Sequence, residues 1–283
     1  MDKILALLDG SIYSESVCHF TGWVAAKLDA DVEAMHVLGR SGDIGTKDLS
    51  GALRLGARSA LLKELSDLDE KRAKLAKAKG HAILEDAKDI FARDKVTKVT
   101  LRLRKGDLLQ AINEIESDIR IIVVGKRGEG ADFASGHLGS NLERIVRSSK
   151  VPILIASRKF NPVSKALVAY DGSKSAKVAI QRLAVSPVCK DLDICIVTVG
   201  DNQEAALKTA REAETKLRSE NIRTSIQVAS GETEIVLSDL IAKDGYDMLI
   251  MGAYGHSRIR SLIIGSTTTA MVQSVKIPVL IYR

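Results

Sequence analysis

The sequence predicts an α/β protein of two tandem domains, each an open, mostly parallel five-stranded sheet with helices on both faces, a Rossmann-like arrangement. The first observation is that an apolar strand followed by Asp-Gly-Ser begins each half, at Asp9 and again at Asp171. The second is that a later apolar strand in each half ends in a glycine loop, at Gly125 and, 127 residues on, at Gly252. The third is that strand-length apolar runs alternate with helical segments, which is the order of parallel strands joined by right-handed crossovers. The same motifs in the same order in both halves indicate two copies of one folding unit.

In the first half, short apolar runs predict strands and longer amphipathic runs predict helices. Ser11 or Ser14 is expected to cap the first helix. The long second helix has a charge-dense middle in which Asp67 and Glu70 are spaced to pair with Lys71 and Lys74 on a solvated face. A basic helix that binds a partner is the alternative, and Gly80 is a candidate break. The predicted strands span 3–8, 32–37, 96–103 and 119–124. The first predicted helix ends at about residue 28, the second spans about 53–93 and the third spans 108–115. Residues 38–50 are predicted to form a loop.

The second half repeats this order in shorter form. Its predicted strands span 166–170, 194–199, 224–228 and 248–251, and its predicted helices span 175–183, 204–219 and 234–243. The offset between the halves falls from 162 residues at Asp-Gly-Ser to 127 at the glycine loops. The difference of 35 residues is predicted to lie in a long helical insertion at about 38–93. The predicted domains are 1–157 and 165–283, joined by a polar linker at 158–164 that contains a proline.

Each half closes on an apolar strand that begins with proline, at 152–156 and at 278–282. Exposed sheet edges of this kind invite pairing with another strand. We therefore expect these strands to join the two domains as an internal pseudo-dimer. A homodimer of whole chains is left open.

Composition agrees with two ordinary domains. A chain of 283 residues, with 45% hydrophobic and 28% charged residues, can bury a core in each half. No apolar run approaches the roughly 20 residues of a membrane span, and the charged start leads into a strand rather than a signal peptide, so no membrane partner and a cytoplasmic location are expected. The net charge of +6 suits an anionic ligand, whereas 4% aromatic residues and no basic stripe speak against nucleic acid as a partner.

The three cysteines, Cys18, Cys189 and Cys195, are isolated in the sequence and lack metal-ligand spacing. Buried, reduced thiols are the favoured interpretation. A thiol switch is the alternative.

The glycine loop of the second half has the features of a phosphate site. Glycines let the backbone approach an anion closely, and the N-terminus of the helix expected at Gly265 attracts negative charge. The hydroxyls of Ser266 and Thr267 are placed to donate to a phosphate oxygen. The alternative is that Gly252 and Gly255 only shape a turn and Ser266 only caps a helix.

The spacing Gly252-x2-Gly255-x9-Gly265-Ser266, with Asp171-Gly-Ser, the strand order and the closing strand, resembles the universal stress protein family over nearly the whole chain. The resemblance implies an adenine nucleotide alpha hydrolase-like fold and binding of ATP, alone or with Mg²⁺. In the second half it implies a site formed by Asp171, Val199, Gly252, Gly255, Arg258, Arg260, Gly265, Ser266 and Thr267. In the first half it implies a weaker site formed by Asp9, Val37, Gly125, Gly128, Gly139 and Ser140.

The two glycine loops differ in length and charge. The first, Gly125-x2-Gly128-x10-Gly139, is one residue longer and carries Asp132 where the second carries Arg258. An acidic residue near a triphosphate repels it, whereas arginine adds charge-assisted contacts. The second half is therefore predicted to bind ATP more tightly, and the first to bind it more weakly, to bind a different ligand or to be empty.

No catalytic apparatus is evident in the sequence, because neither loop has the G-x-x-x-x-G-K-[ST] pattern or an obvious base that would orient a water. We therefore expect no metal site and no enzyme activity beyond slow, incidental ATP hydrolysis. The predicted function is a nucleotide-dependent regulator in the stress response. The alternative is a tandem scaffold that binds no nucleotide and works through protein contacts.

Overall fold

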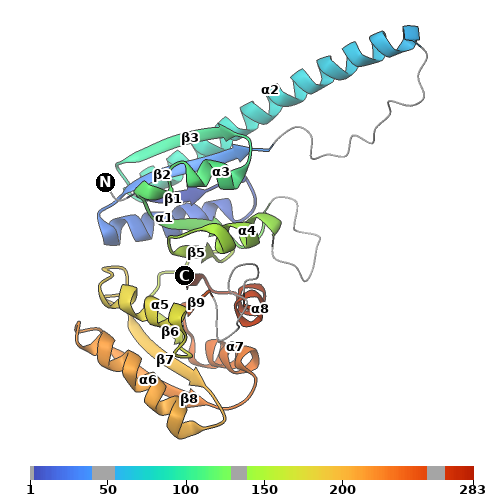
Figure 1. Ribbon diagram of the computed structural model, residues 1–283. Helices are drawn as coiled ribbons and strands as arrows, with labels where there is room; N and C mark the ends of the chain where they lie inside the picture. The colour runs from blue at the N-terminus through green and yellow to red at the C-terminus, as the bar shows by residue number, and fades with distance from the viewer. Residues whose placement is uncertain (1–2, 40–54, 129–138, 254–264) are drawn as a thin grey trace.

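The computed structural model describes residues 3–39, 55–128, 139–253 and 265–283, and for residues 55–62 it describes the backbone alone. The described residues form one mostly parallel sheet of ten strands with helices on both of its faces (Figure 1). The first half contributes β1 (Lys3–Leu7), α1 (Ser14–Leu28), β2 (Asp31–Leu38), α2 (Leu55–Arg93), β3 (Val99–Lys105), α3 (Leu108–Asn113), the 3₁₀ turn η1 (Glu116–Asp118), β4 (Ile119–Gly125), α4 (Ser140–Ser148) and β5 (Ile153–Ala156). The second half contributes β6 (Lys165–Ala169), α5 (Lys174–Ala184), β7 (Asp193–Val199), α6 (Gln203–Arg218), β8 (Thr224–Ala229), α7 (Thr233–Asp244), β9 (Met248–Gly252), α8 (Ser266–Ser274) and β10 (Val279–Tyr282).

The strands run in the order β3-β2-β1-β4-β5-β10-β9-β6-β7-β8. Within each half all neighbours are parallel, as predicted. The two halves meet where β5 and β10 pair antiparallel, with Leu154 opposite Leu280, so the two five-stranded sheets are continuous. In each half the chain winds outward in one direction from the first strand and then returns to its other side. The crevice at that reversal, beyond the carboxyl ends of the strands, is where open α/β sheets bind ligands.

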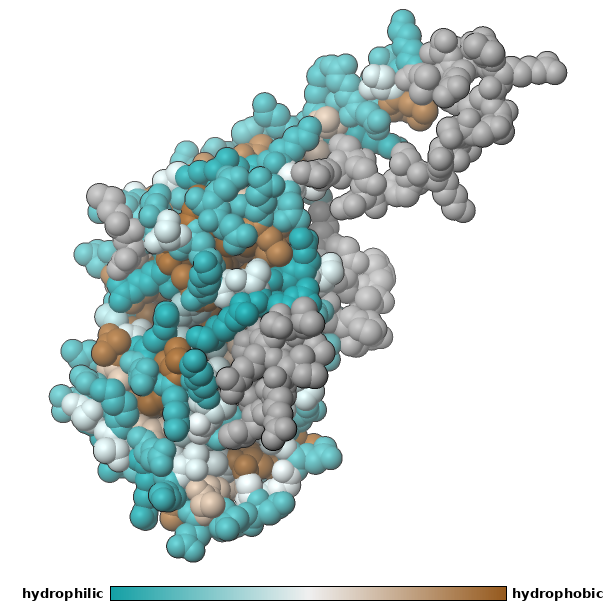
Figure 2. Space-filling view, in the orientation of Figure 1, coloured by the Kyte–Doolittle hydropathy of each residue, from teal (hydrophilic) through white to brown (hydrophobic). Residues whose placement is uncertain are grey.

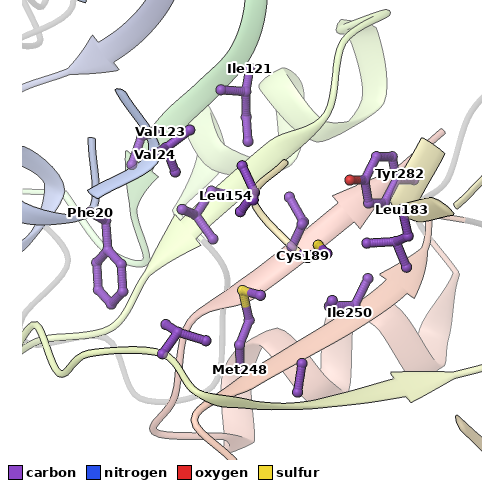
Figure 3. Packing of buried hydrophobic residues seen from close by; sticks show 14 of the residues in the cluster. Phe20, Val24, Ile121, Val123, Leu154, Leu183, Cys189, Met248, Ile250 and Tyr282 are labelled. Carbon is purple, nitrogen blue, oxygen red and sulfur yellow. The ribbon is translucent and has the colours of Figure 1, made fainter. Parts of the chain in front are cut away.

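The helices divide evenly between the two faces of the sheet. One core packs under α1, α2, α5 and α6 and the other under α3, α4, α7 and α8. Both cores cross the seam between the halves, because β5 and β10 alternate their apolar side chains between the faces. Figure 3 shows Leu154 and Tyr282 among buried residues from both halves. Figure 1 shows the N-terminal part of α2 extending well beyond the sheet.

Helix α2 is one helix of 39 residues, so the predicted break at Gly80 is wrong. A Cβ on Gly80 would lie 2.7 Å from Leu103 Cδ1 and 2.9 Å from His36 Cδ2. The glycine therefore lets the helix approach the sheet, and this packing outweighs the modest cost of glycine inside a helix. The predicted pair of Glu70 and Lys74 is confirmed, with a distance of 2.7 Å between the charged atoms.

The predicted serine cap of α1 is also wrong. The helix is preceded by Tyr13, whose side chain makes no capping hydrogen bond. Ser11 and Ser14 instead stabilise the preceding turn: Ser14 Oγ accepts from Gly10 N and lies 3.3 Å from Asp9 Oδ1, and Ser11 Oγ accepts from Tyr13 N. Some boundaries also shift: β3 spans Val99–Lys105 rather than 96–103, α2 begins at Leu55 rather than at 53, and α3 ends at Asn113 rather than at 115.

The segment between β5 and β6, residues 157–164, contacts both halves. The ring of Phe160 packs edge-on against Phe20 of α1, with ring centroids 4.8 Å apart. At the other end, Asp247 beside β9 accepts hydrogen bonds from the backbone N–H groups of Ser164 and Lys165. The predicted linker is therefore packed against the body of the protein.

The three cysteines are free and buried, as predicted. Burial raises the pKa of the Cys18 thiol, and likewise that of Cys189, to about 12. A thiol whose pKa lies so far above neutral pH stays protonated and unreactive. A search of the described helices finds none long and apolar enough to cross a membrane.

Candidate functional site

A cleft of about 1040 Å³ lies at the carboxyl ends of β1, β2 and β4 in the first half. It is the crevice at the reversal of strand order described above. All six residues that the sequence predicted for this half line the cleft, although they come from four separate segments of the chain. They are Asp9, Val37, Gly125, Gly128, Gly139 and Ser140.

The repeated Asp-Gly-Ser forms the same turn in both halves. Asp9 Oδ1 accepts from Ser11 N at 2.9 Å, and Asp171 Oδ1 accepts from Ser173 N at 2.9 Å. The glycine after each aspartate has φ near +75°, at +78° and +72°, a conformation that favours glycine. One carboxylate oxygen of each aspartate therefore holds the turn that follows the first strand.

The first glycine of each loop has a packing role that does not depend on a ligand. A Cβ on Gly125 would lie 2.7 Å from Tyr13 Cβ at the start of α1. A Cβ on Gly252 would lie 2.6 Å from Ser175 Oγ and 2.9 Å from Ala176 N at the start of α5. Only glycine lets the first helix of each half approach the end of the glycine strand this closely.

Among the described residues, no side chain caps the N-terminus of α4 or of α8. Each helix follows a glycine with extended backbone, Gly139 with ψ 132° and Gly265 with ψ 140°, and neither start has a side-chain cap. Uncapped N–H groups in the first helical turn and the helix dipole attract negative charge. Ser140 and Ser266 are the first residues of these helices, so their hydroxyls lie beside the same N–H groups.

An ion pair on the cleft wall was missed by the sequence analysis. Arg144, one turn into α4 from Ser140, lies 2.7 Å from Asp107 Oδ2, and both residues line the cleft. Asp107 also caps α3 by accepting from Leu109 N and Gln110 N. The hydrogen bond from Arg144, with those from the backbone, holds the pKa of the Asp107 carboxyl below its usual range. The i, i+4 spacing of Ser140 and Arg144 was a usable signal, because it places both on one face of a helix.

Two further residues of the cleft come from distant elements. Ala76 and Lys79 of α2 line it, and no local pattern in the sequence placed them there. His36 also lines it, with Nδ1 2.7 Å from Leu8 O. Thr198 takes the same position in the second half, where its hydroxyl donates to Tyr170 O at 2.8 Å.

The second half places its predicted residues in the same order around the sheet. Asp171, Val199 and Gly252 stand at the carboxyl ends of β6, β7 and β9. Gly265, Ser266 and Thr267 begin α8, which is tied to β9 by the buried hydroxyl of Thr268, 3.3 Å from Gly252 O. The remaining predicted residues, Gly255, Arg258 and Arg260, lie outside the described residues, as does Asp132 of the first loop.

Lys126, in the first glycine loop, contacts the other half of the protein. Its Nζ donates to the carbonyl of Val275 at the C-terminal end of α8, with a distance of 2.7 Å. Burial, with a smaller effect from Arg127, lowers the pKa of Lys126 to about 8. The start of α8 belongs to the second candidate site, so this lysine joins the loop of one site to the helix of the other.

Arg283 makes the reciprocal contact. It follows β10 of the second half and donates to the carbonyl oxygens of Arg147 and Ser149 at the C-terminal end of α4. A cation at a helix C-terminus is favourable because the dipole is negative there. Each helix that begins at a candidate phosphate site therefore ends at a cation from the opposite half.

The lysine contact predicts how stability depends on pH. The folded-state pKa of Lys126, about 8, lies below its ordinary value, so between pH 8 and about 10.5 the unfolded chain binds more protons than the folded chain. Between pH 8 and about 10.5, the free energy of unfolding of the wild type should therefore rise relative to that of Lys126→Met. Urea unfolding of both proteins at several pH values measures this. Lys243→Met, at an exposed lysine, is the control and should follow the wild type; a Lys126→Met curve parallel to the wild type would contradict the prediction.

Among the described residues, no group of three or more His, Cys, Asp or Glu side chains is placed to hold a metal ion.

Comparison with known proteins identifies the fold family. The model of the universal stress protein family matches residues 1–157 and 198–283. A universal stress protein of Synechocystis sp. is 37% identical over 287 residues, covering 100% of both chains. The structure of a universal stress protein from Archaeoglobus fulgidus matches with a TM-score of 0.72 at 20% identity, covering 99% of this chain and 97% of that one. A functionally unknown protein from Pseudomonas aeruginosa matches with a TM-score of 0.61 at 13% identity, covering 99% and 91%. At these identities the two structures support the fold alone.

Proposed function

Because this chain belongs to the universal stress protein family, we propose that it is an ATP-binding regulator that acts in the stress response. ATP, alone or with Mg²⁺, would occupy the crevice at the carboxyl ends of the strands. The nucleotide would then bias the conformation or the contacts of the chain, without chemistry being required.

The observation that carries this proposal is the cleft of the first half. Its volume of about 1040 Å³ is at the upper end of typical small-molecule sites. It combines an uncapped helix start at Gly139, the hydroxyl of Ser140 and apolar wall residues such as Val37. A helix N-terminus suits a phosphate chain, and an apolar wall at a strand end suits a base.

Regulation would follow from the difference in affinity between conformations. A ligand that binds one conformation stabilises it by mass action, by about 2.7 kcal/mol at a ligand concentration 100 times its dissociation constant. Lys126 and Arg283 connect the ends of α8 and α4 to the opposite halves. Through these contacts, nucleotide bound in one half would affect the conformation of the other half.

The second half is proposed to bind more tightly. Its sequence places Arg258 and Arg260 between the glycines, where the first half has Asp132. Charge-assisted contacts from arginine to phosphate are about twice as strong as neutral hydrogen bonds.

Two matched variants test the proposal, Gly139→Asp and Gly265→Asp. Both glycines have φ near −55°, which aspartate adopts readily, and aspartate is a good N-cap that occupies the N–H groups a phosphate would use. The helices should therefore keep their stability while phosphate is repelled. Calorimetric titration with ATP and Mg²⁺, thermal unfolding and the quantity of nucleotide released on denaturation are measured for each protein.

We expect Gly265→Asp to remove the tighter site and Gly139→Asp only the weaker one, with unfolding temperatures unchanged or raised. If Gly139→Asp removes the tighter site and Gly265→Asp the weaker one, the protein binds nucleotide but the ranking of the two halves is wrong. A wild type that releases no nucleotide and takes up none would favour the alternative, a tandem scaffold that works through protein contacts. Turnover in the usual enzyme range of about 1 to 1,000 per second would show that the protein is an enzyme instead.

A further inference from the structure

Residues 63–79 of α2 extend away from the sheet and are exposed. Every residue from 63 to 79 is exposed, whereas Gly80 and Leu84 further along the helix are buried. We call residues 63–79 the arm. Figure 1 shows it projecting from the first half, and Figure 2 shows hydrophobic side chains on its otherwise hydrophilic surface.

Three leucines of the arm are spaced as in a coiled coil. Leu65, Leu68 and Leu75 fall at a, d and d positions of a heptad, and their exposed fractions are 46%, 47% and 71%. At 3.6 residues per turn, this stripe lies roughly 130° around the helix from the face by which Gly80 and Leu84 contact the sheet. Among the described residues, the sheet of the first half therefore cannot cover the leucines while α2 stays packed against it.

After Lys63, a basic residue at its start, the charges of the arm are divided into two blocks. Residues 64–70 contain four acidic side chains and no basic one, and residues 71–79 contain five basic side chains and no acidic one. A helix with this division complements a copy of itself that runs in the opposite direction. We infer that the arm is a dimerisation element that pairs antiparallel with the arm of a second copy of this chain.

The pairing has a defined register. With the two-fold axis near Glu70, Leu65 faces Leu75 of the second copy, and Leu68 faces Arg72 of the second copy. The aliphatic stem of arginine can cover a leucine while its charged end stays in water. The acidic block of each arm then lies beside the basic block of the other. The overlap is about 25 Å long, so we expect a dimer that dissociates on dilution. This inference does not depend on nucleotide binding.

Sedimentation of the full chain from about 1 to 100 µM tests whether it dimerises. We expect the mass to rise with concentration from 30.6 kDa towards twice that value, and the dimer to weaken as salt screens the charges. The double variant Leu65→Ser, Leu75→Ser should stay monomeric. The matched control is Ile235→Ser, a similar change at a 59% exposed residue of α7, and it should dimerise like the wild type.

Disulfide trapping tests the direction of pairing. The native cysteines are buried, so cysteines introduced at exposed arm positions report on the arm alone. A mixture of Leu65→Cys and Leu75→Cys proteins should form a mixed disulfide dimer on mild oxidation, whereas neither protein should cross-link with itself. Cross-linking of each protein with itself would indicate parallel arms and overturn the antiparallel pairing.

Charge exchange gives an independent check. A variant with Glu64, Asp67 and Glu70 changed to lysine, and another with Lys71, Lys74 and Lys77 changed to glutamate, should each be monomeric alone and should dimerise when mixed. A wild type that is monomeric at every concentration overturns the inference. If that monomer sediments with vesicles of anionic phospholipid, the stripe contacts lipid instead.

Discussion

Replacing Leu154 by alanine should lower the free energy of unfolding by about 2 to 5 kcal/mol. Leu154 is only 1% exposed and lies on β5 directly opposite Leu280, which is 3% exposed, at the seam between the two halves. The change removes buried methyl groups and leaves a cavity that the rigid sheet cannot close. Because the seam is shared, both halves should unfold at lower denaturant concentration.

Urea unfolding followed by circular dichroism measures this effect, with Val185→Ala as the control at a 69% exposed residue. The control should change stability by less than about 0.5 kcal/mol. Combining Leu154→Ala with Leu280→Ala should cost less than the sum of the two single changes, since both enlarge one cavity. If the effects simply add, or if one half unfolds unchanged, the two halves do not share this core.

Replacing Gly252 by alanine should destabilise the protein by about 1 to 3 kcal/mol. The added Cβ would lie 2.6 Å from Ser175 Oγ, 2.9 Å from Ala176 N and 3.0 Å from Ser175 C. Two of these neighbours are backbone atoms, so the first turn of α5 has to move. That turn begins next to Ser173, which is hydrogen-bonded to Asp171, so nucleotide affinity of the second half should fall as well.

The matched control is Gly39→Ala, because a Cβ at Gly39 meets nothing within 4 Å. Its stability should be unchanged or slightly higher, since alanine restricts the unfolded chain. Thermal and urea unfolding of both variants measure the difference. Equal stability of Gly252→Ala and the wild type would mean that the close approach of α5 is not a constraint of the fold.

Much of the fold was predictable because its signals are local. The Asp-Gly-Ser turns depend on a hydrogen bond between residues two apart, as at Asp9 and Ser11, and on one glycine with positive φ. Apolar runs defined the buried strands, and the repeat related the halves. The family resemblance that these motifs carry implied the six predicted residues of the first half, and all six line its cleft.

The local rules were wrong where another contact competes with them. Gly80 looked like a helix break, but it is the point at which α2 packs against Leu103 and His36. Serine looked like the cap of α1, but Ser14 is engaged with the Gly10 turn. In both places the competing partner is either far away in the sequence or on the other side of a turn.

The sequence by itself determined the repeat, the parallel α/β halves and the glycine, aspartate and serine positions at the strand ends, because each is encoded within a few neighbouring residues. Only the tertiary structure decided which distant side chains meet there. The pair of Asp107 with Arg144 and the contact of Lys126 with Val275 join residues 37 and 149 positions apart. Contacts of that range exist only once the strands are ordered and the two sheets are joined, so no local pattern specifies them.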